Sequence, residues 1–221
     1  MSKAPIPIAL FLALLAPGCG KEEASPVDLG FDYFPRKVGS WIEYQVDSTW
    51  QDEAAGVTGS VSYRLREKVV EAYTDPAGRP AWRIHRVVRD GSGEWVVRDV
   101  WTSTMNAVAA EVAEENLRRL KLSFPVRDGR RWDFNSLNAA EGLEVAFRNV
   151  GLPWTGDSLG FPQTVLVRNT VPANVVERRD FEERYAKGVG LVQKVWHEST
   201  TQSSGTQGWR LEMEAVAFGT E

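Results

Sequence analysis

Apolar and polar residues alternate along most of the chain, which is the pattern of strands that bury one face. Ile42, Tyr44 and Val46 alternate with Glu43 and Gln45, and the same period of two recurs over residues 61–66. Each such segment therefore predicts a half-buried β-strand with one apolar face and one polar face.

Turn-forming sequences divide these segments into hairpins. Residues 75–80 (DPAGRP) predict a turn, because proline fixes φ and glycine tolerates a positive φ. Residues 82–88 and 94–102 flank the turn sequence DGSG at residues 90–93 and predict a β-hairpin. Three further strands in a meander are predicted near the C-terminus, at residues 175–185, 190–201 and 208–218.

Helical character is confined to two segments. Residues 107–120 are rich in Ala, Glu and Leu, and Ala109, Val112 and Ala113 have roughly helical spacing. The neighbouring strands favour β structure there instead, because tertiary context often overrides composition, so helix and strand both stay open for this segment. Residues 137–143 could form a second short helix.

Many strands joined by short turns predict a mainly antiparallel β fold. Two architectures fit: a strongly curved sheet or half-barrel with one or two short helices, or a two-sheet β-sandwich. The curved sheet is favoured, because residues 107–120 could plug its concave side. We expect residues 1–18 to be a signal peptide, residues 19–30 a flexible acylated tether and residues 31–221 a single β-rich domain.

The N-terminus predicts export and lipid attachment. Lys3 precedes an apolar run at residues 4–16, which is well short of the roughly 20 residues that span a bilayer as a helix. The sequence LAPGC at residues 15–19 resembles a bacterial lipobox, and Cys19 is the chain's only cysteine, so it has no partner for an intramolecular disulfide. We therefore expect acyl chains on Cys19 to hold the protein to a membrane.

The amino-acid composition limits which kinds of partner the protein can bind. The chain has 221 residues, of which 43% are hydrophobic and 25% charged. These fractions are typical of a soluble globular protein with enough apolar residues to form a core. Its formal net charge of -4 and the absence of a basic block argue against nucleic acid. Nine tryptophans are spread along the chain; we interpret most as core or sheet-surface residues, with a stacking surface for sugars or an apolar ligand as the alternative.

One short sequence motif occurs twice in the chain. The pattern FPxxxGxW at residues 34–41 recurs as FPxxxGxxW at residues 124–132. We interpret it as a strand-entry device, in which the Phe packs on the sheet, the Gly turns the chain and the Trp begins a strand.

Three blocks of sequence resemble a family of uncharacterised Bacteroidota lipoproteins: residues 32–44, residues 116–132 and residues 185–192 (YAKGVGLV). The sequence KEE after Gly20 also resembles a signal that sends such lipoproteins to the outer face of the outer membrane, although a charged tether would look the same. The resemblance implies an outer-membrane, lipid-anchored address, on the cell surface or on the periplasmic face. It implies no activity, cofactor or catalytic residue.

The sequence predicts no catalytic, metal or cofactor site. His85 and His197 lack carboxylates or cysteines at ligand spacing. Two acidic groups could pair as a glycosidase acid and base, although a solvated face is the preferred interpretation. These groups are Glu111, Glu114 and Glu115, and Asp180, Glu182 and Glu183.

Three classes of function remain. The favoured hypothesis is non-enzymatic binding of a partner protein, a glycan or another envelope component by a lipid-anchored protein. The alternative is a carrier or sensor that holds an apolar or glycan ligand in a Trp-lined concavity. The third is a hydrolase whose catalytic residues are scattered along the chain. A deep cavity inside the sheet would favour the carrier or sensor.

Overall fold

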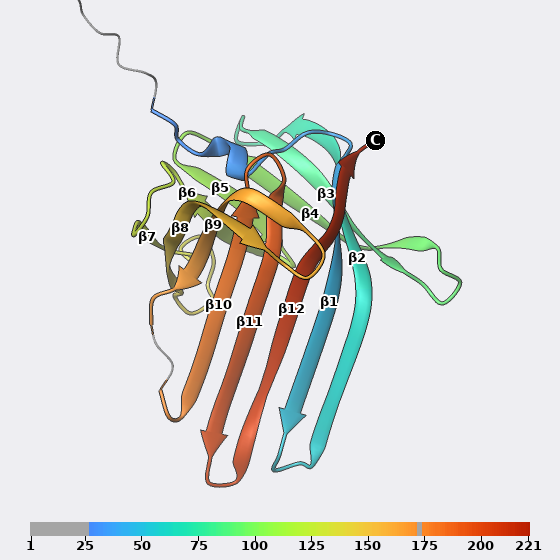
Figure 1. Cartoon of the computed structure of the whole chain (residues 1–221), viewed down its shortest axis with the longest axis vertical. Helices are drawn as coiled ribbons and strands as arrows, with labels where there is room; N and C mark the ends of the chain where they lie inside the picture. Colours follow the sequence, from blue (N-terminus) through green and yellow to red (C-terminus); the bar gives the residue numbers. More distant parts are fainter. Residues whose placement is uncertain (1–26, 172–173) are drawn as a thin grey trace, which may run out of the picture.

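The computed structural model describes residues 27–171 and 174–221, which form one antiparallel sheet of twelve strands (Figure 1). Its order is β6-β5-β4-β3-β2-β1-β12-β11-β10-β9-β8-β7, so the first and last strands pair at the centre. The elements are η1 Phe31–Tyr33, β1 Ser40–Asp52, β2 Val57–Thr74, β3 Pro80–Arg89, β4 Trp95–Met105, β5 Ala109–Glu114, β6 Leu117–Ser123, β7 Arg131–Asp133, β8 Glu144–Thr155, β9 Gly160–Asn169, β10 Glu177–Ala186, β11 Gly190–Gln202 and β12 Gly205–Thr220.

The sheet curls until its two edges nearly meet. At the edges, the backbone N–H of Leu120 in β6 donates to the carbonyl oxygen of Phe134, just after β7, at 3.0 Å. The indole N–H of Trp132 in β7 donates to the carbonyl oxygen of Leu120 at 2.9 Å. The predicted curved antiparallel sheet is therefore confirmed, and the sandwich alternative is wrong because all twelve strands belong to one sheet.

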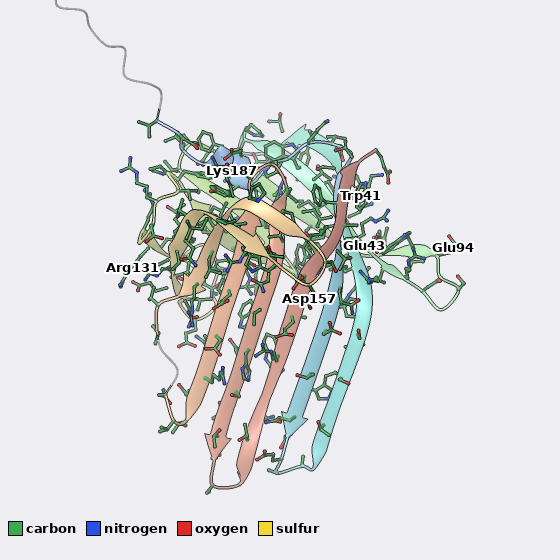
Figure 2. All side chains as sticks on the ribbon, viewed as in Figure 1. Trp41, Glu43, Glu94, Arg131, Asp157 and Lys187 are labelled. Atoms are coloured by element: carbon green, nitrogen blue, oxygen red, sulfur yellow. The ribbon has the colours of Figure 1, made fainter. Side chains whose placement is uncertain are left out.

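The predicted hairpins are also confirmed. β3 and β4 flank the 90–93 turn, and their tip, where Glu94 lies, projects from the body of the sheet (Figure 2). β10, β11 and β12 form the C-terminal meander. Together with β1 and β2, these strands extend well beyond the rest of the sheet (Figure 1).

Residues 107–120 are strands, and they do not plug the concave side. β5 and β6 form a hairpin through Glu115 and Asn116, whose φ values of 48° and 69° suit a two-residue turn between twisted strands. Ala110, Val112 and Glu114 are buried at every second position, as on one face of a strand. The segment extends the sheet and forms part of its wall.

The helix predicted at residues 137–143 is wrong. The chain there forms turns and bends, because short polar side chains bond to nearby backbone groups in place of a helical ladder. The carboxylate of Asp133 accepts from the N–H groups of Asn135 and Leu143, and the Asn138 side chain accepts from the N–H of Ala140. The three-residue 3₁₀ turn η1 is the one helical element among the described residues.

The strand-entry interpretation of the repeated FP motif is confirmed. Phe34 and Phe124 are both almost fully buried, and Gly39 and Gly129 have φ values of 87° and 79°, which favour glycine. The motif enters β1 in one case and β7 in the other. These are the first strands of two successive six-stranded meanders.

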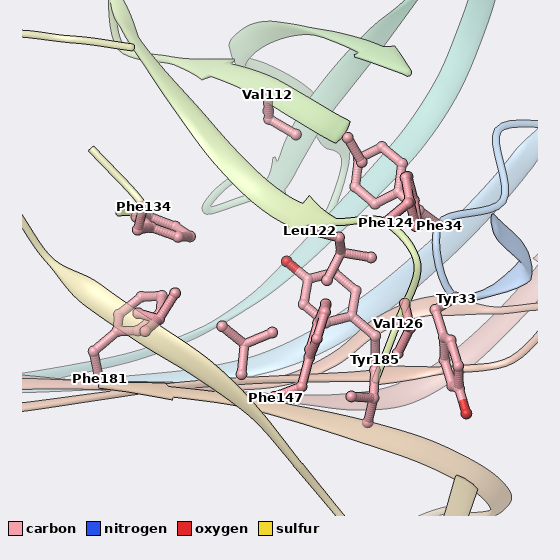
Figure 3. Close-up of a cluster of buried hydrophobic side chains, with 14 of the residues drawn as sticks. Tyr33, Phe34, Val112, Leu122, Phe124, Val126, Phe134, Phe147, Phe181 and Tyr185 are labelled. Atoms are coloured by element: carbon pink, nitrogen blue, oxygen red, sulfur yellow. The ribbon is translucent and has the colours of Figure 1, made fainter. Parts of the chain in front are cut away.

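Most of the core lies between the two walls of the curved sheet. Figure 3 shows Val112 and Leu122 of β5 and β6 facing Phe147 of β8 and Phe181 and Tyr185 of β10. A second cluster lies around Tyr44 of β1 and includes residues of β2, β9, β11 and β12. Since all buried members of both clusters lie between Tyr33 and Ala215, the chain after Cys19 contains the whole described core.

Candidate functional site: a cavity inside the curved sheet

The concave side of the sheet forms a half-open cavity of about 810 Å³. Small-molecule sites in proteins span about 300–1,000 Å³, so the space suits a ligand of moderate size. One wall comes from β1 to β6 and the segment that precedes β1, and the other comes from β10, β11 and β12. Apolar residues that line it include Val61, Ile84, Val88, Val112, Leu117, Leu191, Leu211 and Met213.

Three tryptophans line this cavity: Trp101, Trp196 and Trp209. The rings of Trp196 and Trp209 lie 5.9 Å apart, and Trp209 pairs across the sheet with Trp50. None of the chain's nine tryptophans is fully buried. These partly exposed rings therefore offer contact surface to a ligand in addition to packing on the sheet. This arrangement fits the alternative interpretation of the tryptophans, a stacking surface for a sugar or an apolar ligand.

The cavity lining is strongly basic although the chain is acidic overall. Seven basic side chains line the cavity against three acidic ones, whereas the whole chain has a net charge of -4. The basic residues are Arg36, Arg86, Arg89, Arg98, Arg119, Lys121 and Lys194. A low-dielectric space with this excess of positive charge attracts anions.

Four charged side chains form a buried cluster at the cavity wall. The ammonium of Lys121 lies 2.5 Å from a carboxylate oxygen of Glu114 and 2.6 Å from one of Glu183. The ammonium of Lys194 lies 3.3 Å from the same Glu183 oxygen, and the Tyr185 hydroxyl donates to the other. Glu183 is completely buried. Each buried carboxylate is thus matched by ammonium groups, as burial of charge requires.

Strand pairing and a β-bulge explain why the side chains of this cluster lie together. Glu183 of β10 and Lys194 of β11 are cross-strand partners. Lys121 lies at a β-bulge, because Leu120 pairs with Glu111 and Leu122 pairs with Ala110, which leaves Lys121 as the extra residue. A bulge re-aims a side chain, and here it directs Lys121 toward the interior.

Neighbouring charges favour the ionised forms of Glu114 and Lys121. Burial by itself would raise the pKa of Glu114, but Lys121, Lys194 and Arg119 outweigh it and lower that pKa to about 2. Burial would lower the pKa of Lys121, but Glu114 and Glu183 raise it above its ordinary value. Burial and the adjacent Glu183 raise the pKa of the Tyr185 hydroxyl well above 10.

The acidic candidates from the sequence divide into two groups. Glu114 and Glu183 converge through Lys121, so the interpretation of these two as a solvated face is wrong. The others form ion pairs elsewhere: Glu111 with Arg79, Glu182 with Arg168 and Asp180 with Arg178, while Glu115 lies in the β5–β6 turn. A glycosidase acid needs a raised pKa, whereas Glu114 has a lowered one, so this pair does not suit that chemistry.

The two histidines lie away from the cavity lining. Nδ1 of His197 lies 3.9 Å from a carboxylate oxygen of Asp180, and burial together with Arg178 lowers the His197 pKa. Over residues 27–171 and 174–221, no group of three or more His, Cys, Asp and Glu side chains is placed to hold a metal ion.

Cys19 lies outside the described residues. The described chain contacts the domain as early as Asp28, whose carboxylate lies 2.8 Å from the ammonium of Lys187. Within the part of the chain that the structure describes, no helix is both long and apolar enough to cross a membrane.

Comparison with known proteins leaves the family of the chain open. No family model matches the sequence, and no curated protein matches it. Two solved structures are similar: one from Bacteroides fragilis, described as an exported protein with a YmcC-like fold (12% identity, TM-score 0.44), and one from Parabacteroides distasonis, described as a lipoprotein (13% identity, TM-score 0.43). Each comparison covers 85% of this chain and 98% of the other.

Proposed function

We propose that this protein binds an apolar or amphipathic component of the cell envelope, without enzymatic turnover, inside its curved sheet. The observation that carries the proposal is the cavity of about 810 Å³, with its aliphatic residues and three tryptophans. A ligand that buried apolar surface there would gain about 25 cal/mol for each Å² removed from water. The alternative class from the sequence, a carrier or sensor with a Trp-lined concavity, thereby becomes the preferred one.

We further propose that acyl chains on Cys19 hold the protein to the outer membrane. The lipobox-like sequence at residues 15–19 and the lone cysteine support this address. Because Asp28, nine positions after Cys19, already pairs with Lys187 of the domain, an acylated Cys19 would keep the domain close to the bilayer surface. A protein held there is well placed to receive or present a poorly soluble molecule.

Cys19→Ala is expected to abolish lipid attachment and to release the exported protein into the soluble fraction. The cause is the loss of the only thiol that can carry acyl chains. Metabolic labelling with a radioactive fatty acid, followed by membrane fractionation, measures both effects, and Ser25→Ala serves as the control. Labelling that persists in Cys19→Ala would overturn the anchor, and protease treatment of intact cells then separates a surface from a periplasmic address.

Ligand binding is tested with N-phenyl-1-naphthylamine, a neutral apolar dye that brightens when it leaves water. Residues 20–221, which contain the whole described core, should bind it saturably. Val88→Trp places a large ring at a position that lines the cavity and is expected to weaken dye binding by about tenfold or more.

Val97→Trp is the matched control, because Val97 lies on the neighbouring strand, is 55% exposed and does not line the cavity. This control should bind the dye like the unmodified chain. The proposal would be contradicted if the unmodified chain showed no saturable binding, or if both Trp variants bound the dye equally well while folded by circular dichroism.

A further inference from the structure

We propose that the ligand carries an anionic head, a carboxylate or a phosphate, and that Arg36 binds this head inside the cavity. The inference rests on the proposed function and adds the chemical class of the ligand. Its starting point is the basic lining of the cavity, in which Arg36 is a buried cationic group without an acidic partner among the described residues.

Arg36 differs from the cationic groups on the strands around it. Its Nε–H donates to the hydroxyl of Ser103 at 3.0 Å, one Nη–H donates to the carbonyl of Pro35 at 3.0 Å, and its guanidinium lies 3.5 Å from the centre of the Phe34 ring. No carboxylate of the described residues lies within ion-pair distance of Arg36. Burial lowers the Arg36 pKa to about 10, so the group still carries its charge at neutral pH.

Three other basic groups of the lining already have acidic partners. Arg86 lies 3.0 Å from carboxylate oxygens of both Glu67 and Asp99. Lys121 and Lys194 share Glu183. Arg36, in contrast, has N–H groups left over for an additional anion.

A second hydrogen-bond donor in the cavity lining also favours a ligand that is rich in hydrogen-bond acceptors. The indole N–H of Trp101 is buried and has no hydrogen-bond partner among the described residues. Trp101 and Ser103 lie two positions apart on β4, so their side chains project from the same face of the strand. Because Ser103 accepts from Arg36, the arginine and this indole belong to one region of the wall.

These contacts define the chemistry of the ligand. A guanidinium recognises carboxylate and phosphate oxygens with paired, charge-assisted hydrogen bonds. The aliphatic residues and tryptophans of the same cavity suit an apolar body. A fatty carboxylate and an alkyl phosphate both meet this description, and neither a neutral lipid alcohol nor a cationic lipid does.

The test compares four twelve-carbon ligands that differ only in the head: dodecanoate, dodecyl phosphate, dodecanol and dodecyltrimethylammonium. Each displaces N-phenyl-1-naphthylamine from residues 20–221, below the concentration at which it aggregates. At least one anion should compete at a concentration about tenfold or more below that of dodecanol, and the cation should compete least. The relative strength of the two anions distinguishes a carboxylate from a phosphate ligand.

Arg36→Gln should remove most of this preference and leave dodecanol competition within about twofold. Arg36→Lys keeps the charge and should retain part of it. Arg64→Gln is the control for net charge, because Arg64 is exposed on β2 and does not line the cavity, and it should behave like the unmodified chain.

Two results would overturn the anionic head: equal competition by the anions and dodecanol in the unmodified chain, or an anion preference that survives in folded Arg36→Gln. The comparison of the anions with dodecanol uses only the unmodified chain, so it tests the proposal even if Arg36→Gln fails to fold. Failure of the dye itself to bind would instead contradict the proposed function, which keeps the two failures distinct.

Discussion

Glu183→Gln is expected to lower the free energy of unfolding by about 3–5 kcal/mol. The substitution removes the negative charge that Lys121 and Lys194 share and leaves two ammonium groups in the interior with only Glu114 opposite them. Domains of this kind are stabilised by about 5–15 kcal/mol in total, so the loss is a large share. Urea unfolding of residues 20–221 at pH 7 measures it.

Glu182→Gln is the matched control on the same strand. Glu182 pairs with Arg168 at 3.1 Å, and the Arg168 side chain is 57% exposed, so its loss should cost less than about 1 kcal/mol. Equal effects of the two substitutions would show that the buried cluster has no special role in the stability of the fold.

Acidification is expected to remove about 3 kcal/mol of stability through Glu114 alone. Its pKa is about 2 in the folded protein and 4.5 when unperturbed, and each unit of difference corresponds to about 1.4 kcal/mol. Because the folded pKa is the lower one, this contribution is present above about pH 4.5 and disappears as the pH falls through about 2. Urea unfolding at pH 7, 5, 3 and 2 follows the loss.

Glu114→Gln should be less stable at pH 7 and should lose correspondingly less on acidification. Glu94→Gln, at the exposed tip of the β3–β4 hairpin, should keep the pH dependence of the unmodified chain. A Glu114→Gln variant whose stability falls with pH as steeply as that of the unmodified chain would mean that this carboxylate does not titrate as described.

The strands and turns could be predicted because local chemistry determines them. Alternation of the type seen at Ile42, Tyr44 and Val46 survives in the fold as a strand with an inner and an outer face. The hairpin at residues 115–116 had a usable signal, since Asn readily adopts a positive φ, but the Ala-rich and Glu-rich composition of residues 107–120 obscured it. No helix forms at residues 137–143, because the side chains of Asp133 and Asn138 accept from backbone N–H groups there.

The charged cluster could not be predicted, because its members come together only through the curvature of the sheet. Glu114 and Glu183 are 69 positions apart, and each belongs to a group of acids that would suit a solvated face. The inward position of Lys121 depends on a bulge that its own sequence does not mark. Likewise, nothing near Arg36 in sequence indicates that Ser103 of β4 will hold its guanidinium.

A crystal structure of residues 20–221 grown with 11-bromoundecanoate would show directly whether the cavity receives a ligand. We expect an anomalous bromine peak inside the cavity, among residues such as Trp101, Trp196 and Trp209, and a carboxylate at hydrogen-bond distance from Arg36. Bromine peaks found only on the outer surface of the sheet, with the cavity free of the ligand, would contradict it.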